Sequence, residues 1–233
     1  MADSLRARLQ DVRARIERAA SRAGRDPARV RLVAVSKTFS VEHVRAAADA
    51  GQLDFGENKV QEALDKMDRT ADLPIRWHLV GHLQSNKARK AAARFDVIHS
   101  IDSPSLVQKL DEAATAAGRN VELLVQIDLA EEPTKHGARE ADLPPIFDTA
   151  RTCRAVRVTG LMLLPPVVDD PEAARPYFKE LIAVRSRLLE RGVEASQLQQ
   201  LSMGMSHDFE VAVEEGATLV RVGTAIFGGR SYV

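Results

Sequence analysis

Short apolar segments that alternate with amphipathic helical segments constrain the fold of this chain more than any other sequence feature. The segment Leu123-Leu-Val-Gln-Ile127 is apolar on both faces, which is typical of a strand that is covered on both sides. Such strands belong to parallel sheets flanked by helices, so the pattern predicts an α/β fold. We expect strands at residues 31–36, 53–56, 76–81, 97–100, 122–128, 156–160, 198–201 and 218–222, and helices at 41–50, 58–69, 86–94, 104–117, 141–152, 171–191 and 208–215.

The number of strands narrows the fold class. Eight strands alternating with helices in 233 residues predict a (β/α)8 barrel of the TIM type, with an open doubly wound sheet as the alternative. An extra N-terminal helix is expected up to about Arg22, because Leu5, Leu9 and Val12 begin an apolar stripe of helical period. No linker or low-complexity run interrupts residues 1–233, so a single domain is expected.

Charge and cysteine content limit the partners and the compartment. The chain carries 33 Lys and Arg against 33 Asp and Glu, which gives no basis for expecting nucleic acid or an anionic membrane as a partner. Its single cysteine, Cys153, excludes an internal disulfide and suits a reducing cytosol. There is no signal-like N-terminus and no apolar run of about 20 residues. We therefore expect a soluble cytoplasmic protein, and the lack of an obvious apolar patch favours a monomer.

The residues that follow the strands are the candidates for chemistry, because barrel sites lie at the C-terminal ends of the strands. Lys37 directly follows the first strand, and a lysine in a partly apolar barrel mouth has a lowered pKa. Its neutral amine can attack a carbonyl to form a Schiff base. The alternative is a lysine that extends from the strand end into water.

Two segments near the C-terminus are rich in Gly, Ser and Thr. They are Leu201-Ser-Met-Gly-Met-Ser-His207 and Arg221-Val-Gly-Thr-Ala-Ile-Phe-Gly228, and each follows an expected strand, the seventh and the eighth. Their backbone N–H groups and hydroxyls suit a phosphate dianion, and barrels often bind phosphate at these two loops. With Lys37, they indicate a phosphorylated aldehyde held as an imine.

Other polar residues near the strand ends have two interpretations each. Arg221 either forms a structural ion pair or donates to a ring nitrogen, which it would keep unprotonated. Asn58 either caps the following helix or binds a ligand oxygen. His78 and His82 stand four residues apart on a strand and loop, without a Cys or acidic cluster, so no metal site is expected.

The remaining candidates are weaker. Glu131, Lys135, His136 and Gly137 follow the fifth strand, whereas the other lysines that we considered, Lys66 among them, lie in helical patterns and are expected in solvent. Glycine-rich motifs of nucleotide-binding proteins and the nucleophile motif of α/β-hydrolases are absent from the sequence.

The motifs together resemble one family. The segments Ala34-Val-Ser-Lys-Thr38, Phe55-Gly-Glu-Asn58, Gly81-His-Leu-Gln-Ser-Asn-Lys87, Leu201-Ser-Met-Gly-Met-Ser206 and Val220-Arg-Val-Gly-Thr-Ala-Ile-Phe-Gly228 are similar to the pyridoxal-phosphate homeostasis protein family, in order over nearly the whole chain. One small departure lies in strand 5, where Gln126 and Asp128 stand in place of the residues that the family often has.

The resemblance implies a barrel like the N-terminal domain of alanine racemase, which is fold type III of the pyridoxal-phosphate proteins. It also implies pyridoxal 5′-phosphate (PLP) in imine linkage to Lys37. The implied site residues are Ser206, Gly223 and Thr224 for the phosphate, Arg221 for the pyridine nitrogen, and Asn58, His78 and Met203 for the pocket wall.

The family is regarded as a carrier of vitamin B6 without an established catalytic activity, and PLP-dependent apo-enzymes are its conceivable recipients. The alternative is a racemase-like or aldolase-type imine enzyme. Racemisation needs proton-transfer groups on both faces of the substrate. Of the two tyrosines, Tyr177 lies in a helical pattern and Tyr232 is penultimate, and the β-rich domain of alanine racemases has no counterpart in this sequence. We therefore expect a carrier that is not an enzyme.

Overall fold

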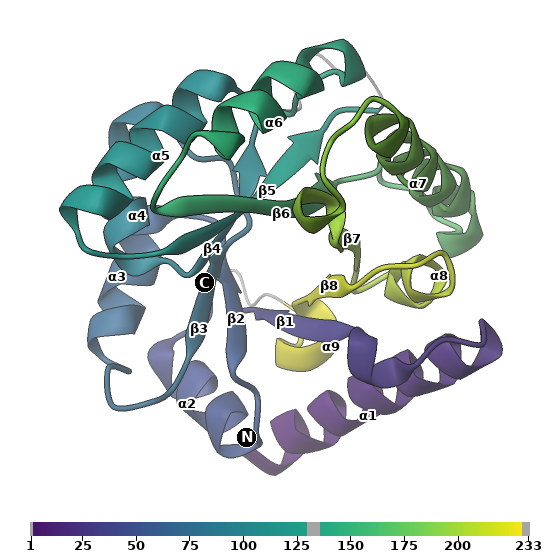
Figure 1. The fold of residues 1–233 in the computed structure, drawn as a ribbon. Helices are drawn as coiled ribbons and strands as arrows, with labels where there is room; N and C mark the ends of the chain where they lie inside the picture. Colours follow the sequence, from purple (N-terminus) through teal and green to yellow (C-terminus); the bar gives the residue numbers. More distant parts are fainter. Residues whose placement is uncertain (1, 130–135, 230–233) are drawn as a thin grey trace.

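The strands close into a parallel barrel with β1 hydrogen-bonded to both β2 and β8 (Figure 1). The structure is a computed structural model, and it describes residues 2–129 and 136–229. Closure confirms the barrel and excludes the open sheet. The strands are β1 (Arg31–Val35), β2 (Asp54–Glu57), β3 (Arg76–Leu79), β4 (Val97–Ile101), β5 (Val121–Ile127), β6 (Val156–Leu163), β7 (Gln200–Met205) and β8 (Leu219–Val222).

Helices form the outer ring of the barrel, as Figure 1 shows from the end at which the strands begin. The α-helices are α1 (Ala2–Arg22), α2 (Val41–Asp49), α3 (Val60–Asp68), α4 (Ala88–Arg94), α5 (Pro104–Ala116), α6 (Leu143–Arg151), α7 (Arg175–Glu190), α8 (Phe209–Glu214) and α9 (Thr224–Phe227). Short 3-10 helices lie at Pro27–Arg29 (η1), Ser85–Lys87 (η2), Glu140–Asp142 (η3), Pro171–Ala174 (η4) and Ala195–Leu198 (η5).

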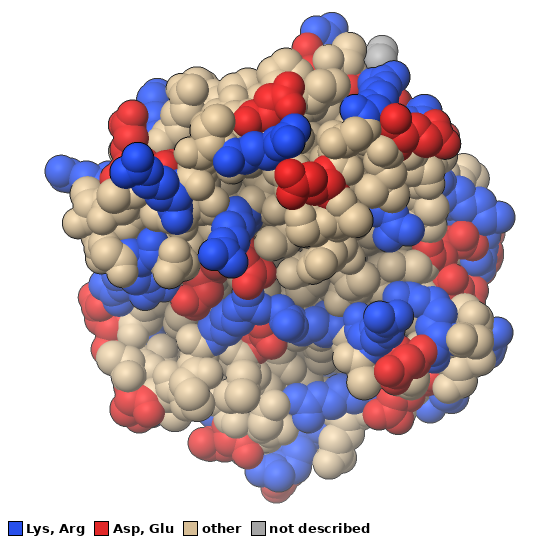
Figure 2. Space-filling view, in the orientation of Figure 1, with Lys and Arg blue, Asp and Glu red and all other residues tan. Residues whose placement is uncertain are grey.

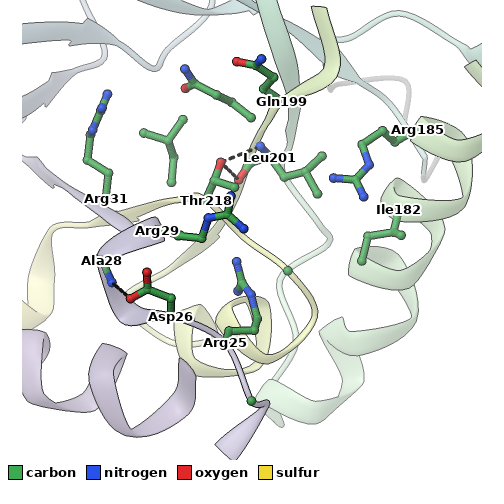
Figure 3. A pocket seen from close by; sticks show the side chains of 14 residues that line it. Arg25, Asp26, Ala28, Arg29, Arg31, Ile182, Arg185, Gln199, Leu201 and Thr218 are labelled. Carbon is green, nitrogen blue, oxygen red and sulfur yellow. Dashed lines mark hydrogen bonds between the residues drawn. The ribbon is translucent and has the colours of Figure 1, made fainter. Parts of the chain in front are cut away.

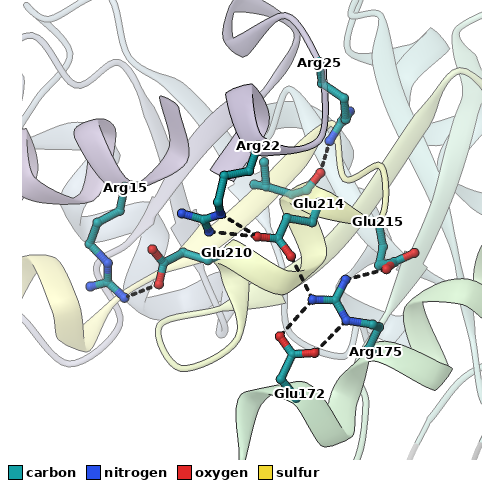
Figure 4. Close-up of polar contacts among 9 residues, drawn as sticks. Arg15, Arg22, Arg25, Glu172, Arg175, Glu210, Glu214 and Glu215 are labelled. Carbon is teal, nitrogen blue, oxygen red and sulfur yellow. Dashed lines mark hydrogen bonds and ion pairs between the residues drawn. The ribbon is translucent and has the colours of Figure 1, made fainter. Parts of the chain in front are cut away.

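Helix α1 is the extra helix that the sequence predicts, and it packs against α2, α8 and α9. Its apolar stripe is buried, including Leu5 and Leu9, which are at most 1% exposed. Ion pairs along its polar side join it to α8: Arg15 lies 3.0 Å from Glu210, and Arg22 lies 2.8 Å from Glu214 (Figure 4). The helix thereby covers the barrel where its first and last strands meet.

Most of the core lies between the strands and the helices. A smaller apolar cluster of Val33, Val97, Leu124, Met162 and Leu219 fills part of the barrel interior. Buried polar side chains occupy the interior beside it, including His78, His99 and Arg221, each at most 3% exposed. The interior is therefore a packed core with a polar cluster in it.

Sequence and structure differ mainly at the ends of the last strands. Residues 202–205 belong to β7, although we expected that strand to end at residue 201, and β6 extends to Leu163 instead of residue 160. Periodicity gave no sign of the β7 extension because serine, glycine and methionine do not form an apolar strand pattern, whereas the β6 extension, Leu161–Leu163, is apolar and was cut short at Gly160. The short helix α9 was not anticipated either. No helix in the described part of the chain is long and apolar enough to cross a membrane.

Candidate functional site

A cavity of about 590 Å³ opens at the end of the barrel where the strands terminate. Its wall includes Lys37 after β1, Asn58 after β2, Ser206 after β7, and Gly223 and Thr224 after β8. Arg221 of β8 also contributes to the wall. The structure thus brings six of the eight site residues proposed from the sequence to one cavity, whose size falls within the usual range for cofactor sites, about 300–1,000 Å³.

Lys37 is presented by a turn with an unusual backbone. The next residue, Thr38, has φ of +67°, a left-handed conformation that costs non-glycine residues energy. The Thr38 N–H donates to a carboxylate oxygen of Glu62 over 2.6 Å, which helps to hold the turn. Lys37 itself is half-buried. The turn fixes where its amine emerges into the cavity.

A buried lysine supports the same turn from below. Lys66 of α3 is 5% exposed, and its ammonium donates to the Ser36 carbonyl oxygen and to Glu57 Oε1, each over 2.7 Å. The Ser36 hydroxyl also donates to Glu57 Oε1, over 2.6 Å. Burial raises the pKa of Glu57, and the Lys66 ammonium opposes that rise. The expectation that Lys66 lies in solvent is wrong, because α3 turns this position onto the strand ends.

Ser206 and Gly223 form a small polar cradle beside the cavity. The Ser206 hydroxyl oxygen accepts from the Gly223 N–H over 3.1 Å and from the Ala225 N–H over 3.4 Å. A Cβ atom on Gly223 would stand only 3.1 Å from the Val35 carbonyl oxygen, so this position has little room for a side chain. Thr224 is exposed beside it. Because the Ser206 oxygen accepts from both N–H groups, its hydroxyl proton can be donated to an oxyanion.

Arg221 lies at the inner wall of the cavity and is 3% exposed. It donates to the Ser202 hydroxyl over 2.5 Å and to the Leu163 carbonyl oxygen over 2.8 Å. No carboxylate among the described residues forms a salt bridge with it, so the structure gives no support to the ion-pair alternative. Burial lowers the pKa of Arg221 to about 10, which leaves the side chain cationic at neutral pH.

A chain of hydrogen bonds continues from Arg221 across the barrel interior. The Ser202 hydroxyl lies 2.9 Å from His99 Nδ1, His99 Nε2 lies 2.9 Å from His78 Nδ1, and His78 Nε2 lies 2.9 Å from Asp54 Oδ1. Strands β8, β7, β4, β3 and β2 contribute one residue each. We call this set, Arg221–Ser202–His99–His78–Asp54, the barrel relay.

The donor in each hydrogen bond of the barrel relay follows from the two residues at its ends, the Asp54 carboxylate and the Arg221 guanidinium. Burial lowers the pKa of both His78 and His99, so each ring is neutral and carries one N–H. The pKa of Asp54 is also lowered: burial opposes this shift, but the hydrogen bond from His78 favours the carboxylate. His78 therefore donates to Asp54, His99 donates to His78, and Ser202 donates to His99.

Two residues proposed for the cavity wall lie elsewhere. His78 is fully buried in the barrel relay, below the level of Val80 and Gly81, which do line the cavity. Met203 is fully buried in the core between strands and helices. An irregularity in the pairing of β7 with β8 between Ser202 and Met205 shifts the alternation of faces, so that Met205 reaches the cavity.

Asn58 does not act as a helix cap. The N-cap position of α3 is Lys59, and no side-chain capping bond is present there. Asn58 contributes to the cavity wall, and its backbone packs against Gly81 so closely that a Cβ on Gly81 would lie 2.3 Å from the Asn58 carbonyl oxygen. The glycine at position 81 therefore sets the position of Asn58.

Three further residues line the wall that the sequence analysis named without assigning them a role in the site: His82, His136 and Gln126. His82 and His136 stack at its rim with ring centroids 3.6 Å apart, although they are far apart in the chain. Burial and the neighbouring His136 lower the pKa of His82. Gln126 donates to the His136 carbonyl oxygen and thereby ties this rim to β5. Only folding brings the two histidines together, so no local motif could have revealed the pair.

Some sequence-based candidates cannot be placed. Glu131, Lys135 and Tyr232 lie outside the described residues. Tyr177 is on α7 and packs against the core. Among residues 2–129 and 136–229, no three His, Cys, Asp or Glu side chains gather as a metal site would require.

Comparison with known proteins places this geometry in a family. Residues 7–231 match the model of the family described as alanine racemase, N-terminal domain. The pyridoxal phosphate homeostasis protein of Aquifex aeolicus is 40% identical, covering 97% of this chain and 98% of the relative. That of Pseudomonas aeruginosa is 43% identical, with 96% and 95% covered. These relatives are named as homeostasis proteins and not as enzymes.

Solved structures agree. PipY of Synechococcus elongatus, solved with PLP bound, is 41% identical with a TM-score of 0.81, covering 92% of this chain and 100% of PipY. An alanine racemase of Clostridium difficile is 15% identical with a TM-score of 0.73, covering 99% of this chain but 58% of the racemase, which shows a shared fold. The chain therefore belongs to the pyridoxal phosphate homeostasis protein family, on the fold of the alanine racemase N-terminal domain.

Proposed function

We propose that this protein binds pyridoxal 5′-phosphate reversibly through a Schiff base to Lys37 and buffers or delivers the cofactor in the cell. The observation that carries the proposal is the meeting of Lys37, the Ser206–Gly223 cradle and Arg221 at one cavity. The name of the homologous PipY structure, which includes bound PLP, supports the same ligand. We further propose that residues 1–233 act as one domain.

The residues at the cavity fit the three functional groups of the cofactor. Gly223 carries no side chain at the cavity wall, and the Ser206 and Thr224 hydroxyls can donate hydrogen bonds to the phosphate. Arg221 is a cation that cannot accept a proton, so it suits an unprotonated pyridine nitrogen. Asn58 can hydrogen-bond a ring substituent. His78 and Met203 act on the site indirectly, His78 through its hydrogen bonds in the barrel relay and Met203 through its packing in the core.

Lys37 supplies the covalent bond. As a neutral amine, Lys37 would hold the aldehyde carbon of the cofactor as a Schiff base with release of one water molecule, and addition of water would free the cofactor again. The bound cofactor would supply an electron sink, but an unprotonated pyridine is a weak one. This favours storage over strong carbanion chemistry, in agreement with the names of the relatives. We therefore propose a carrier that is not an enzyme.

Apo-enzymes that require PLP are the proposed recipients, without nucleic acid or membrane as partners. The proposed form is a cytoplasmic monomer, and the single Cys153 suits that compartment.

The first test is the visible absorption spectrum of the purified protein after incubation with PLP, before and after borohydride reduction, followed by peptide mass mapping. We expect an imine band that disappears on reduction and a pyridoxyl-phosphate mass on the peptide containing Lys37. The loaded protein is then incubated with a PLP-dependent apo-enzyme, whose recovered activity measures transfer. A protein that cannot be loaded, or that carries the adduct only on other lysines, would overturn the proposal. Turnover of amino acids by the loaded protein would favour the enzyme alternative.

A further inference from the structure

A second hollow lies at the opposite end of the barrel from Lys37, where the strands begin. Its volume is about 920 Å³, and it lies between the α1–β1 connection, α7, the start of β7 and the loop before β8. Figure 2 shows this end of the molecule, with Lys and Arg side chains gathered around its centre. The hollow is unrelated to the proposed PLP site in position and in lining.

The charges of this hollow are unbalanced. Four arginines line it, namely Arg25, Arg29, Arg31 and Arg185, against one carboxylate, that of Asp26. The Asp26 carboxylate already accepts from the Ala28 N–H over 3.0 Å at the start of η1. In Figure 3 the guanidinium groups of Arg25, Arg29 and Arg185 extend toward the same space. Although basic and acidic residues are equal in number over the whole chain, positive charge is concentrated in this hollow.

Three of the four arginines have no carboxylate partner among the described residues, whereas Nε of Arg31 lies 3.9 Å from Asp54 Oδ1. Nε of Arg185 is buried and has no hydrogen-bond partner within the described part of the chain. Arg29 is exposed and forms no ion pair with any described residue. Arg25 donates to the carbonyl oxygens of Val213 and Ala217 and to no carboxylate. Burial, and secondly the neighbouring Arg29, lower the pKa of Arg25, as expected where like charges are held together.

We propose that this arginine hollow binds a small polyanion, a metabolite with two or more phosphate or carboxylate groups. The planar guanidinium group pairs bidentately with two oxygens of a carboxylate or a phosphate, which suits it to these anions better than any other side chain. One anionic group would neutralise Arg25 and Arg29 of the same loop, and the other would engage Arg185 from α7. The size of the hollow allows for an organic body beside the half-buried Ile182. This site is independent of the proposed PLP function.

The test is a calorimetric titration of the PLP-loaded protein, in which the Ser206–Gly223 cradle is occupied, with inorganic pyrophosphate and, in parallel, with citrate, at a constant ionic strength of about 0.15 M. We expect saturable binding of one anion per chain. Tighter binding of pyrophosphate would indicate a phosphate-bearing ligand, and tighter binding of citrate a ligand with carboxylate groups. Arg185→Gln and Arg29→Gln should each weaken binding about tenfold, because each removes charge-assisted hydrogen bonds. Arg89→Gln, which removes an exposed arginine of α4, is the matched control and should leave binding unchanged.

Amide NMR of the same PLP-loaded protein separates this site from the Lys37 cavity. Pyrophosphate should shift the resonances of Gly24 and Gly216, which line the arginine hollow, and not that of Gly223. Shifts at Gly223 alone, the absence of saturable binding, or equal weakening by Arg89→Gln would overturn the proposal. If Arg185→Gln fails to fold, Arg29→Gln still tests the proposal, because Arg29 is exposed.

Discussion

Nδ1 of His78 and Nε2 of His99 lie 2.9 Å apart in the barrel interior, and one proton serves both atoms. Because the Asp54 carboxylate takes the other N–H of His78, the shared proton belongs to His99. The same reasoning makes Ser202 the donor to His99 and Arg221 the donor to Ser202. A row of donors that all point one way polarises each member and holds the Arg221 guanidinium in a fixed orientation.

Replacing His99 by phenylalanine should break the barrel relay at its centre. The change leaves the acceptor atom of His78 and the hydroxyl proton of Ser202 buried without partners, so we expect a loss of about 2–4 kcal/mol in the free energy of unfolding. Urea denaturation of both proteins measures it. His207→Phe, at an exposed site, is the control and should change stability little. Equal stability of wild type and His99→Phe would mean that the relay contributes nothing.

Stability should depend on pH in a direction set by the two histidines. Their pKa values are lowered by burial, that of His99 well below its ordinary value of 6.5. The unfolded chain therefore binds protons more readily than the native one. The stabilisation is complete above about pH 6.5 and declines below it, by at most about 1.4 kcal/mol per pH unit for each histidine. Denaturation from pH 8 to 5 should show this fall, and the slope should be shallower in His99→Phe.

The buried pair of Lys66 and Glu57 should show strong coupling. Lys66→Met leaves the Glu57 carboxylate buried without its cation, so we expect a loss of about 3–5 kcal/mol. The double variant Lys66→Met, Glu57→Gln removes both charges and should recover part of that loss. Urea denaturation of the four proteins forms a double-mutant cycle, and additive effects would show that the two side chains are not coupled. Lys109→Met, an exposed change on α5, is the control for lysine removal.

Glycine 81 offers a test of the cavity wall. An added methyl group would lie 2.3 Å from the Asn58 carbonyl oxygen, which is backbone and cannot move aside easily. Gly81→Ala should therefore destabilise the protein by about 1–3 kcal/mol and displace Asn58, which weakens PLP binding. Gly229→Ala introduces the same methyl group into open space and should be neutral. Thermal unfolding and absorption titration measure the two effects, and identical behaviour of the two variants would contradict the predicted contact.

Substitutions of single cavity residues should distinguish the residue that binds PLP covalently from the residues that adjust its affinity and absorption. Lys37→Ala should abolish the borohydride-trapped adduct at this position but retain weaker, phosphate-driven binding of PLP. Arg221→Ala should have a larger effect on the absorption maximum and on the affinity for PLP than on the stability of the fold. Ser206→Ala removes the hydroxyl that accepts from Gly223 and should weaken binding of PLP more than that of phosphate-free pyridoxal. A Ser206 variant that weakens both ligands equally would place the phosphate elsewhere.

The local sequence determined the secondary-structure elements and the strand ends at which a functional site could form. The apolar strands and helical stripes follow from side-chain periodicity, and residues such as Lys37, Ser206 and Gly223 could be selected because each follows a strand. Motif order also indicated the family. The inferences on the fold and the family succeeded because they depend on neighbours in the chain, where spacing and residue type carry the information.

Tertiary structure decided everything that depends on contacts across the barrel. Closure joined β1 to β8 and so brought Lys37 beside Gly223. The irregular pairing of β7 directed Met205 instead of Met203 to the cavity, and α3 turned Lys66 inward. The barrel relay and the arginine hollow each combine segments that are far apart in the chain. No local pattern encodes such meetings, because they depend on strand register and helix orientation, which the packing of the whole core determines.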